Sequence, residues 1–374
     1  MKLVVGLLIG LVVMMGRGEA QETLPYPENK GYYFGDFSLL IWQANSDNFN
    51  YAAQNTTSIN IPNPPKDLDT NFSFQDADGQ DLHFSPGVRA AIGYSRYASN
   101  WSYILEGTFF HTRNKSSKKA PITIGNPFSY ITPTLNQSFS GFAADEASGS
   151  WTLNYTNLDL LAAYNILCCE RLVLMPSFGL RASIINNHFV ASYENVTYPF
   201  NDPDTGVAFA TAPHSETDVN NQTVAGGLKG GIDFSVPFLR NWNLFGGFAG
   251  SLLYGQYNLK EKIFGYVPEI TTSDPPVNAL NTIRIVENDR VWRCNTNFEG
   301  ELGFSYLSCC KWFEIQVSLS YFFSYWVNQS YFYNLTFSPT PLAGLILFEN
   351  FFDFEKKNTN LLLNGFALSF DFIF

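Results

Sequence analysis

The chain has 374 residues, of which 45% are hydrophobic and 17% aromatic, whereas only 15% carry a charge. A mean hydropathy of −0.06, with no apolar run of about 20 residues beyond the N-terminus, excludes a bundle of membrane-spanning helices. A net charge of −11, with no basic run longer than the cluster Lys115, Lys118 and Lys119, excludes a nucleic-acid-binding surface.

The first 20 residues have the pattern of a secretory signal peptide. Lys2 is followed by an apolar stretch over residues 3–15, and the small residues Gly18 and Ala20 flank Glu19. This order predicts cleavage after Ala20. A membrane-anchoring helix is the alternative, which the short apolar stretch disfavours. We therefore assign 1–20 to a signal peptide and 21–374 to one folded domain.

Beyond the leader, apolar residues at every second position recur in segments joined by alternating short and long connections. Period two predicts β-strands with one apolar face. The first strand is expected at 32–44, and pairs of strands joined by short turns follow at 85–112, 158–185, 224–257 and 292–326, with a last strand at the C-terminus. The long connections are expected at 45–83, 115–150, 187–221, 260–290 and 327–359.

The last strand, LLLNGFALSFDFIF, shows the pattern most clearly, because Phe366, Leu368, Phe370, Phe372 and Phe374 alternate with small or polar residues. Short turns, long loops and an apolar outer face are typical of outer-membrane β-barrels. We therefore predict an all-β, transmembrane antiparallel barrel in the bacterial outer membrane with long extracellular loops. Ten strands have the best support, and twelve to sixteen remain open. The aromatic Phe374 resembles the signal read by the barrel assembly machinery.

Soluble sandwiches and jelly rolls are also built from antiparallel strands with one apolar face, so they are the alternative fold. Aromatic residues near the expected strand ends favour the barrel, because barrels carry aromatic girdles at both membrane interfaces. These residues are Tyr32, Tyr33, Trp42, Trp101, Trp151, Trp242, Trp292, Trp312 and Trp326.

Four segments carry recurring aromatic patterns, namely FSLLIWQANSDNFNYA, PGVRAAIGYSRYASNWSYILEGTFFHT, NWNLFGGFAGSLLYGQY and WVNQSYF. They resemble the major outer membrane protein-like porins of Legionella, chlamydiae and related bacteria. The likeness extends over most of residues 31–374, and its motifs are loose aromatic patterns. It implies a pore-forming outer-membrane barrel that passes small solutes, without fixing which solute.

If the apolar residues face lipid, the charged residues between them face the lumen. These candidate pore-lining residues are Arg89, Glu106, Arg181, Lys229, Asp233, Arg293, Glu299, Glu301 and Glu314. Charges of both signs in a water-filled pore tune ion selectivity. The plainer alternative is that each charge hydrates the interior or pairs with a neighbour. We expect a porin for passive diffusion of small hydrophilic solutes and ions, and the alternative is a structural or adhesive barrel with a loop-plugged lumen.

Four of the five cysteines form adjacent pairs in two short turns, Cys168 with Cys169 and Cys309 with Cys310. The predicted topology places both turns in the oxidising periplasm. The turns belong to hairpins that are not neighbours, so a bridge between them would be long. Disulfides to neighbouring barrels or envelope proteins are one hypothesis, which the chlamydial resemblance also suggests, and reduced, buried cysteines are the other.

We expect no enzyme activity. The histidines His83, His111, His188 and His214 lie near strand tops or in loops, and no nucleophile motif or metal-ligand spacing accompanies them. No cofactor is expected. The expected partners are outer-membrane lipid and lipopolysaccharide, the barrel assembly machinery, and either copies of the chain in a homotrimer or disulfide-linked envelope proteins, but not nucleic acid.

Overall fold

The computed structural model describes residues 31–46, 52–55, 71–72, 83–96, 100–119, 130–133, 144–169, 172–202, 206–239, 241–270, 278–309, 314–337 and 352–373. The expected signal peptide and Phe374 lie outside these residues. Among them, no helix is long and apolar enough to cross a membrane.

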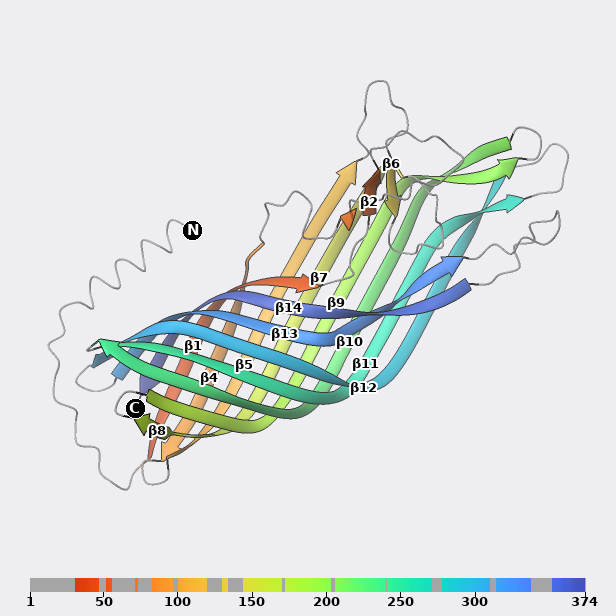
Figure 1. The fold of residues 1–374 in the computed structure, drawn as a ribbon. Helices are drawn as coiled ribbons and strands as arrows, with labels where there is room; N and C mark the ends of the chain where they lie inside the picture. Colours follow the sequence, from red (N-terminus) through yellow and green to blue (C-terminus); the bar gives the residue numbers. More distant parts are fainter. Residues whose placement is uncertain are drawn as a thin grey trace.

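Ten long antiparallel strands close into a barrel (Figure 1). Each strand pairs with the next along the chain, and β1 closes the ring by pairing with β14 on one side and β4 on the other. The ten strands are β1 (Gly31–Ser46), β4 (Ser85–Arg96), β5 (Trp101–Lys119), β7 (Glu146–Tyr164), β9 (Leu172–Asp202), β10 (Gly206–Leu239), β11 (Trp242–Ile270), β12 (Asn278–Cys309), β13 (Glu314–Phe337) and β14 (Phe352–Ile373). The prediction of a ten-stranded antiparallel barrel is confirmed.

Four short strands accompany the ten long ones, and one of them, β8, belongs to the barrel sheet. β8 (Ile166–Cys169) pairs with the start of β9 beside a short turn. The other three, β2 (Ala52–Asn55), β3 (Asn71–Phe72) and β6 (Tyr130–Pro133), form a small separate sheet.

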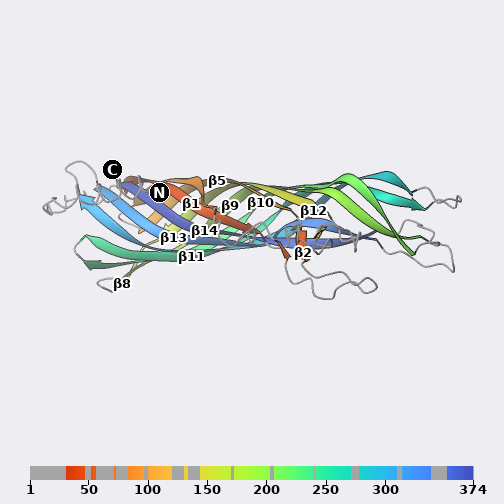
Figure 2. The ribbon, with the colours of Figure 1, turned by 90° about the horizontal axis from the view of Figure 1, so that it is seen from above.

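The two ends of the barrel differ (Figure 2). At one end short connections join β4 to β5, β10 to β11 and β12 to β13, and this end also holds the start of β1 and the end of β14, where Phe34 pairs with Ile373. At the other end the connections from β1 to β4, β5 to β7 and β13 to β14 are long, whereas three residues, 203–205, join β9 to β10 and seven, 271–277, join β11 to β12. In barrels of this kind short turns face the periplasm and long loops face the outside.

Two of the expected loops are strands instead. The β9–β10 hairpin runs through 187–221, and the β11–β12 hairpin runs through 260–290, with Asn187 paired to Asn221 and Lys260 to Asn288. The inward side chains remain buried there, for example Phe189 and Ile263. Only the outward face changes from apolar to polar, which removes the alternation that the sequence prediction relied on.

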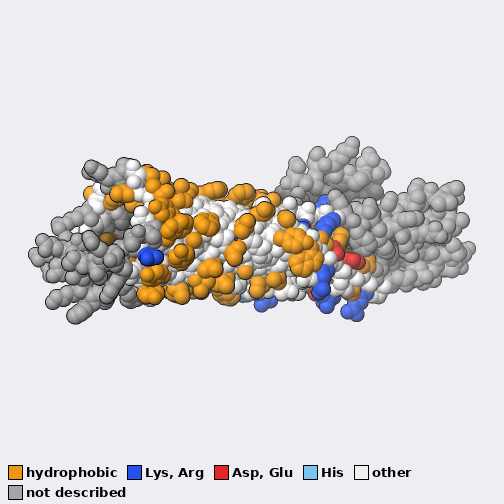
Figure 3. All heavy atoms as spheres, turned by 90° about the horizontal axis from the view of Figure 1, so that it is seen from below, with side chains coloured by type: hydrophobic (Ala, Val, Ile, Leu, Met, Phe, Trp, Pro, Cys, Tyr) orange, Lys and Arg blue, Asp and Glu red, His pale blue; other side chains and the backbone are white. Residues whose placement is uncertain are grey.

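The outward face of the barrel carries a continuous apolar band (Figure 3). Large apolar side chains are exposed around the ring, among them Ile92, Leu228, Phe248 and Leu302, with exposed fractions of 53–66%. At the extracellular edge the band ends at Phe109, Leu158, Ile184, Val224, Tyr254 and Trp292. A surface of this kind requires hydrocarbon as its solvent. Phe366 of the C-terminal strand lies on it, as the alternation predicted.

The core of the molecule lies inside the lumen. Trp42, Trp151 and Trp326 are only 1–2% exposed and point inward, so their expected place in a membrane-interface girdle is wrong. Their positions share the inward parity of buried neighbours such as Ser38, Leu153 and Ser324. Trp242 and Trp292 do face outward, as a girdle requires. The extracellular half of the lumen is therefore packed with aromatic rings from the barrel's own wall.

Candidate functional site

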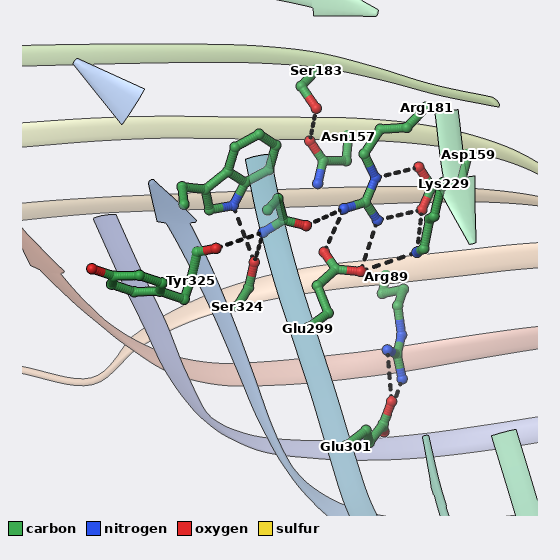
Figure 4. A network of polar contacts seen from close by, with 12 residues as sticks. Arg89, Asn157, Asp159, Arg181, Ser183, Lys229, Glu299, Glu301, Ser324 and Tyr325 are labelled. Atoms are coloured by element: carbon green, nitrogen blue, oxygen red, sulfur yellow. Dashed lines mark hydrogen bonds and ion pairs between the residues drawn. The ribbon is translucent and has the colours of Figure 1, made fainter. Parts of the chain in front are cut away.

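Charged side chains of β4, β7, β9, β10 and β12 cross the middle of the lumen, together with polar side chains of the same wall (Figure 4). They reach the lumen because each occupies the strand face opposite the lipid-facing residues. On β9, for example, Arg181 lies between the outward residues Leu180 and Ala182, and on β7 Asp159 lies between Leu158 and Leu160.

Arg181 is the centre of a buried group of four charges. Its Nε and Nη2 atoms donate to the two carboxylate oxygens of Asp159, at 2.7 and 2.6 Å, and Nη1 and Nη2 donate to those of Glu299, at 2.6 and 2.9 Å. A further bond from Nη1 reaches Asn297 Oδ1 at 2.7 Å. These bonds use the full donor capacity of the guanidinium. Arg181 and Asp159 side chains are each 2% exposed.

Lys229 of β10 completes this group. Its Nζ lies 2.7 Å from Asp159 Oδ2 and 3.0 Å from Glu299 Oε2. The two cations and two carboxylates are formally neutral together. We call Asp159, Arg181, Lys229 and Glu299 the buried quartet. A buried ion group with matched charge and full hydrogen bonding avoids the large cost of an isolated buried charge.

A second ion pair crosses the lumen beside the quartet. Arg89 of β4 donates from Nη1 and Nη2 to the Glu301 oxygens of β12, at 3.1 and 3.3 Å. Four strand steps separate β4 from β12 around the ring, so the pair spans the interior. Glu301 also accepts a hydrogen bond from Ser320 Oγ at 2.5 Å. Because Glu299 and Glu301 are two positions apart on one strand, the pair and the quartet form one charged layer.

A cavity of about 420 Å³ adjoins the charged layer and extends toward the periplasmic end. Its walls include both groups of the layer and residues close to the short turns, such as Asn165, Val173 and Gln316. Carboxylates outnumber cations among its lining residues: Asp36, Glu106, Asp233, Glu299, Glu301 and Asp371 against Arg89, Arg181 and Lys229.

Aromatic rings cover the charged layer on its extracellular side. The Arg89 guanidinium lies over the ring of Phe322, 5.9 Å from its centroid. Phe322 stacks on Trp42 with a centroid distance of 4.8 Å and an interplanar angle of 7°. Both residues pair with Gly365 on the strand between them, where a Cβ atom would lie 2.2 Å from the Ile41 carbonyl oxygen and 2.9 Å from Trp42 Cα. The glycine allows β1 and β13 to bring the two rings together.

Seven of the nine predicted pore-lining residues surround the layer or its cavity. Arg293 lies elsewhere, in the extracellular half, with its guanidinium 4.1 Å from the ring centroid of Tyr257 and its Nη2 2.6 Å from the Asn328 carbonyl oxygen. Glu314 begins β13 beside a short turn, opposite Cys309. Neither belongs to the charged layer.

The sequence prediction omitted Asp159, Asp36 and Asp371, which belong to the same group of charges. Asp159 is a buried member of the quartet, and the other two line the cavity close to the end where the chain termini of the barrel meet. The signal was present in each case, because all three lie between lipid-facing residues on their strands. Applying the alternation rule to every acidic residue would have found them.

The remaining candidates lie away from the lumen. His111, His188 and His214 are on the outer face, where their ring nitrogens lie 2.6 Å from Asn154 Oδ1, 2.8 Å from Asp218 Oδ1 and 2.8 Å from Glu194 Oε1. Among the described residues no cluster of three or more His, Cys, Asp or Glu side chains is suited to hold a metal ion.

Cys168 and Cys294 are exposed, and neither forms a disulfide within the described part of the chain. The side chains of Cys169 and Cys309, and the whole of Cys310, lie outside the described residues. The predicted intermolecular disulfides therefore stay a prediction.

Comparison with solved structures finds barrels of low sequence identity. The outer membrane protease OmpT from Escherichia coli shares 12% identity with a TM-score of 0.40, over 94% of this chain and 99% of that chain. The toluene transporter TodX of Pseudomonas putida shares 7% identity with a TM-score of 0.25, over 93% of this chain and 90% of that chain. A FadL homologue of Pseudomonas aeruginosa shares 8% identity with a TM-score of 0.21, over 91% and 89% respectively.

No curated protein matches the chain. A family model does match residues 24–374, nearly the whole length, and it describes the Legionella pneumophila major outer membrane protein precursor. The match agrees with the resemblance seen in the sequence and with the closed barrel and its apolar band. The chain belongs to the Legionella major outer membrane protein family and is a β-barrel of the bacterial outer membrane.

Proposed function

We propose that the protein is a narrow porin, through which small cations and small hydrophilic solutes diffuse passively, and that the charged layer is its constriction. The observation that carries the proposal is the charge of the lumen. Around the layer and the cavity, seven carboxylates, including Asp159, face three cations, a formal excess of four negative charges.

Such an excess selects for cations. A lumen of low-dielectric walls focuses the field of its fixed charges, so cations are concentrated and anions are repelled. Four carboxylates of the lining, Asp36, Glu106, Asp233 and Asp371, form no salt bridge with a described cation, so they make up this excess. Glu106 and Asp233, which supply half of it, are therefore expected to contribute to the preference.

Unpartnered polar atoms beyond the layer support a water path through the extracellular half. The Oδ1 atoms of Asn221 and Asn295, both polar atoms of the Gln329 amide, and Glu261 Oε1 are buried without a hydrogen-bond partner among the described residues. A buried polar atom without a partner is costly, and water is the usual partner inside a roomy polar site. Water that reaches these atoms provides the route along which a small ion remains hydrated.

One observation favours a second candidate function, a closed structural or adhesive barrel. Trp42, Trp151 and Trp326 fill the extracellular half of the lumen with almost no exposed surface. In this case the lumen is plugged by the wall's own side chains, and not by loops as the sequence suggested. Function would then rest on the outer surfaces.

Single-channel recording in planar bilayers separates the two functions. The porin is expected to give small, discrete current steps and, in a KCl gradient, a reversal potential that favours K⁺. The double substitution Arg89→Ser with Glu301→Ser removes the lumen-spanning pair without leaving a lone charge, so it should enlarge the steps. A matched substitution on the outer face, Arg96→Ser, should leave them unchanged. Silence of both the wild type and the double variant, with the barrel shown to be folded by heat-modifiable gel mobility, supports the closed barrel.

A further inference from the structure

A polar belt follows the apolar band on its extracellular side, along the outward positions of β5, β7, β9, β10, β11 and β12. Strand register defines its rows. Arg113 pairs with Thr152, Thr152 with His188, His188 with Asn220, and Asn220 with Lys260, so these five residues form one row around the barrel. The row nearer the membrane begins at His111, and the row farther out begins at Lys115. Amide and hydroxyl side chains occupy most positions between the charges.

The belt is strongly positive in a chain of net charge −11. Its three rows contain five cations, Arg113, Lys115, Lys260, Lys262 and Arg290, against one carboxylate, Asp218. Figure 3 shows Lys and Arg side chains gathered at this edge of the band. No charged residue occupies the outward positions of these six strands within the band itself. The positive charge is thus concentrated at the level where acyl chains end and headgroups begin.

Most of the cations are available to a ligand. Arg113, Lys115 and Lys260 are exposed, and none forms a salt bridge with a carboxylate of the described residues. Arg290 donates to Asn258 Oδ1 at 3.1 Å, a neutral acceptor that leaves its charge uncompensated. Lys262 differs, because its Nζ lies 2.9 Å from Asp218 Oδ2.

Aromatic residues of the apolar band lie next to Lys260 and Arg290, on the membrane side of these two cations. Trp292 is two positions from Arg290 on the outward face of β12, and it stacks on Tyr254 with a centroid distance of 5.5 Å. Aromatic rings of this kind occupy the boundary between the hydrocarbon and the headgroups. A lipid whose chains lie against these rings therefore brings its headgroup to Arg290 and Lys260.

The dimensions suit a large phosphorylated headgroup. Outward positions two residues apart are about 6.8 Å apart along a strand, so three rows cover about 14 Å. Five strand spacings separate β5 from β12, about 24 Å around the barrel. The belt accordingly offers two cationic points, Arg113 with Lys115 and Lys260 with Arg290, joined by hydrogen-bonding amides. Arginine and lysine bind phosphate oxygens, and amides suit the hydroxyl groups of sugars.

We propose that this belt docks the phosphorylated glycolipid of the outer leaflet, with its phosphates on the two cationic points and its acyl chains on the apolar band. The inference depends on the barrel's place in the outer membrane and not on whether the lumen conducts. A soluble phosphate compound would not need cations aligned with the edge of the band, whereas a lipid places its phosphates at that level.

Binding of lipid A to the refolded full chain in detergent tests the proposal. Dissociation constants would be measured by native mass spectrometry for diphosphorylated lipid A and for the same lipid without phosphates. We expect the diphosphorylated form to bind more tightly. Each cation removed should weaken its binding about fivefold, and a double variant, Arg113→Gln with Lys115→Gln, about 25-fold. Asp218→Asn should tighten binding, a gain that loss of structure would not produce.

Arg96→Gln is the matched control, because Arg96 is also exposed on the outer face but lies at the periplasmic end of β4. It should leave the dissociation constant unchanged, and heat-modifiable gel mobility should show every variant folded. The proposal is overturned if both forms of the lipid bind equally, if Arg96→Gln weakens binding as much as Lys115→Gln, or if millimolar inorganic phosphate displaces the lipid completely.

Discussion

Replacing Arg181 with glutamine should destabilise the barrel more than any exposed charge substitution. The variant removes five hydrogen bonds to Asp159, Glu299 and Asn297. Two buried carboxylates then share a single cation, Lys229, and the quartet acquires a net negative charge. Breaking a buried ion group by removing one partner costs about 3–5 kcal/mol, because the remaining charge is neither hydrated nor paired.

Urea unfolding of the refolded barrel in detergent, followed by tryptophan fluorescence, measures this change in the free energy of unfolding. Arg181→Lys is the informative companion, because lysine retains the charge but has only three donors and lacks the planar fork. It should recover part of the loss, about 1–2 kcal/mol. The double variant Arg181→Gln with Asp159→Asn should recover more, since it restores a neutral pair between Lys229 and Glu299.

The exposed Arg113→Gln serves as the control and should change stability by less than about 0.5 kcal/mol. If Arg181→Gln costs no more than Arg113→Gln, the quartet does not stabilise the fold. If the double variant is no more stable than Arg181→Gln alone, the uncompensated negative charge of the quartet is not the reason for the loss.

Three further outcomes are expected, two from single substitutions and one from a double substitution. Gly365→Ala should lower the free energy of unfolding by about 2–4 kcal/mol, because φ is +152° and the new Cβ would meet the Ile41 carbonyl oxygen. Gly107→Ala is the control in the same urea assay and should be tolerated, because no atom lies within 4 Å of its Cβ position. Glu261 lies beyond the apolar band, and burial raises its pKa to about 7, so the folded state keeps a proton that the unfolded state releases near pH 4.5. The wild type should therefore lose about 2–3 kcal/mol of stability as the pH rises from 4.5 to 7.5. Glu261→Gln should abolish this loss. Glu106→Gln with Asp233→Asn should shift the reversal potential toward that of an unselective pore, and an unchanged value would contradict the proposed origin of cation preference.

Local alternation was enough to predict most of the architecture. It assigned the strands, the lipid face and the inward direction of residues such as Arg89 and Glu299, because each of these depends only on the residues immediately before and after. It was also enough to predict an outward Trp292. The errors arose where residue type was used in place of alternation. Trp42, Trp151 and Trp326 were assigned to a girdle because of their residue type, although the parity of their neighbours placed them inside.

The contacts across the lumen could not be predicted in the same way. Whether Arg89 meets Glu301 or Glu299 depends on the stagger of strands around the whole ring, which no single hairpin specifies. The extent of β9 to β12 was hidden for a related reason. Above the membrane the outward face no longer needs apolar residues, so the strands lose their sequence signal while their hydrogen bonding and their buried inward face continue.

The two charged regions of this barrel should differ in their response to salt, because one is exposed and the other is buried. The polar belt is exposed, so raising the salt concentration from 0.1 to 1 M, which shortens the Debye length from about 10 to 3 Å, should screen its attraction for lipid phosphate. The quartet is almost inaccessible to ions, with Arg181 and Asp159 side chains 2% exposed, so its contribution to stability should persist.

We therefore expect the difference in lipid A affinity between wild type and Arg113→Gln with Lys115→Gln to vanish at 1 M KCl. The difference in unfolding free energy between wild type and Arg181→Gln should remain within about 1 kcal/mol of its low-salt value. If high salt removed the second difference as well, water and ions would have free access to the quartet, and the lumen would be an open channel instead of one constricted by the charged layer.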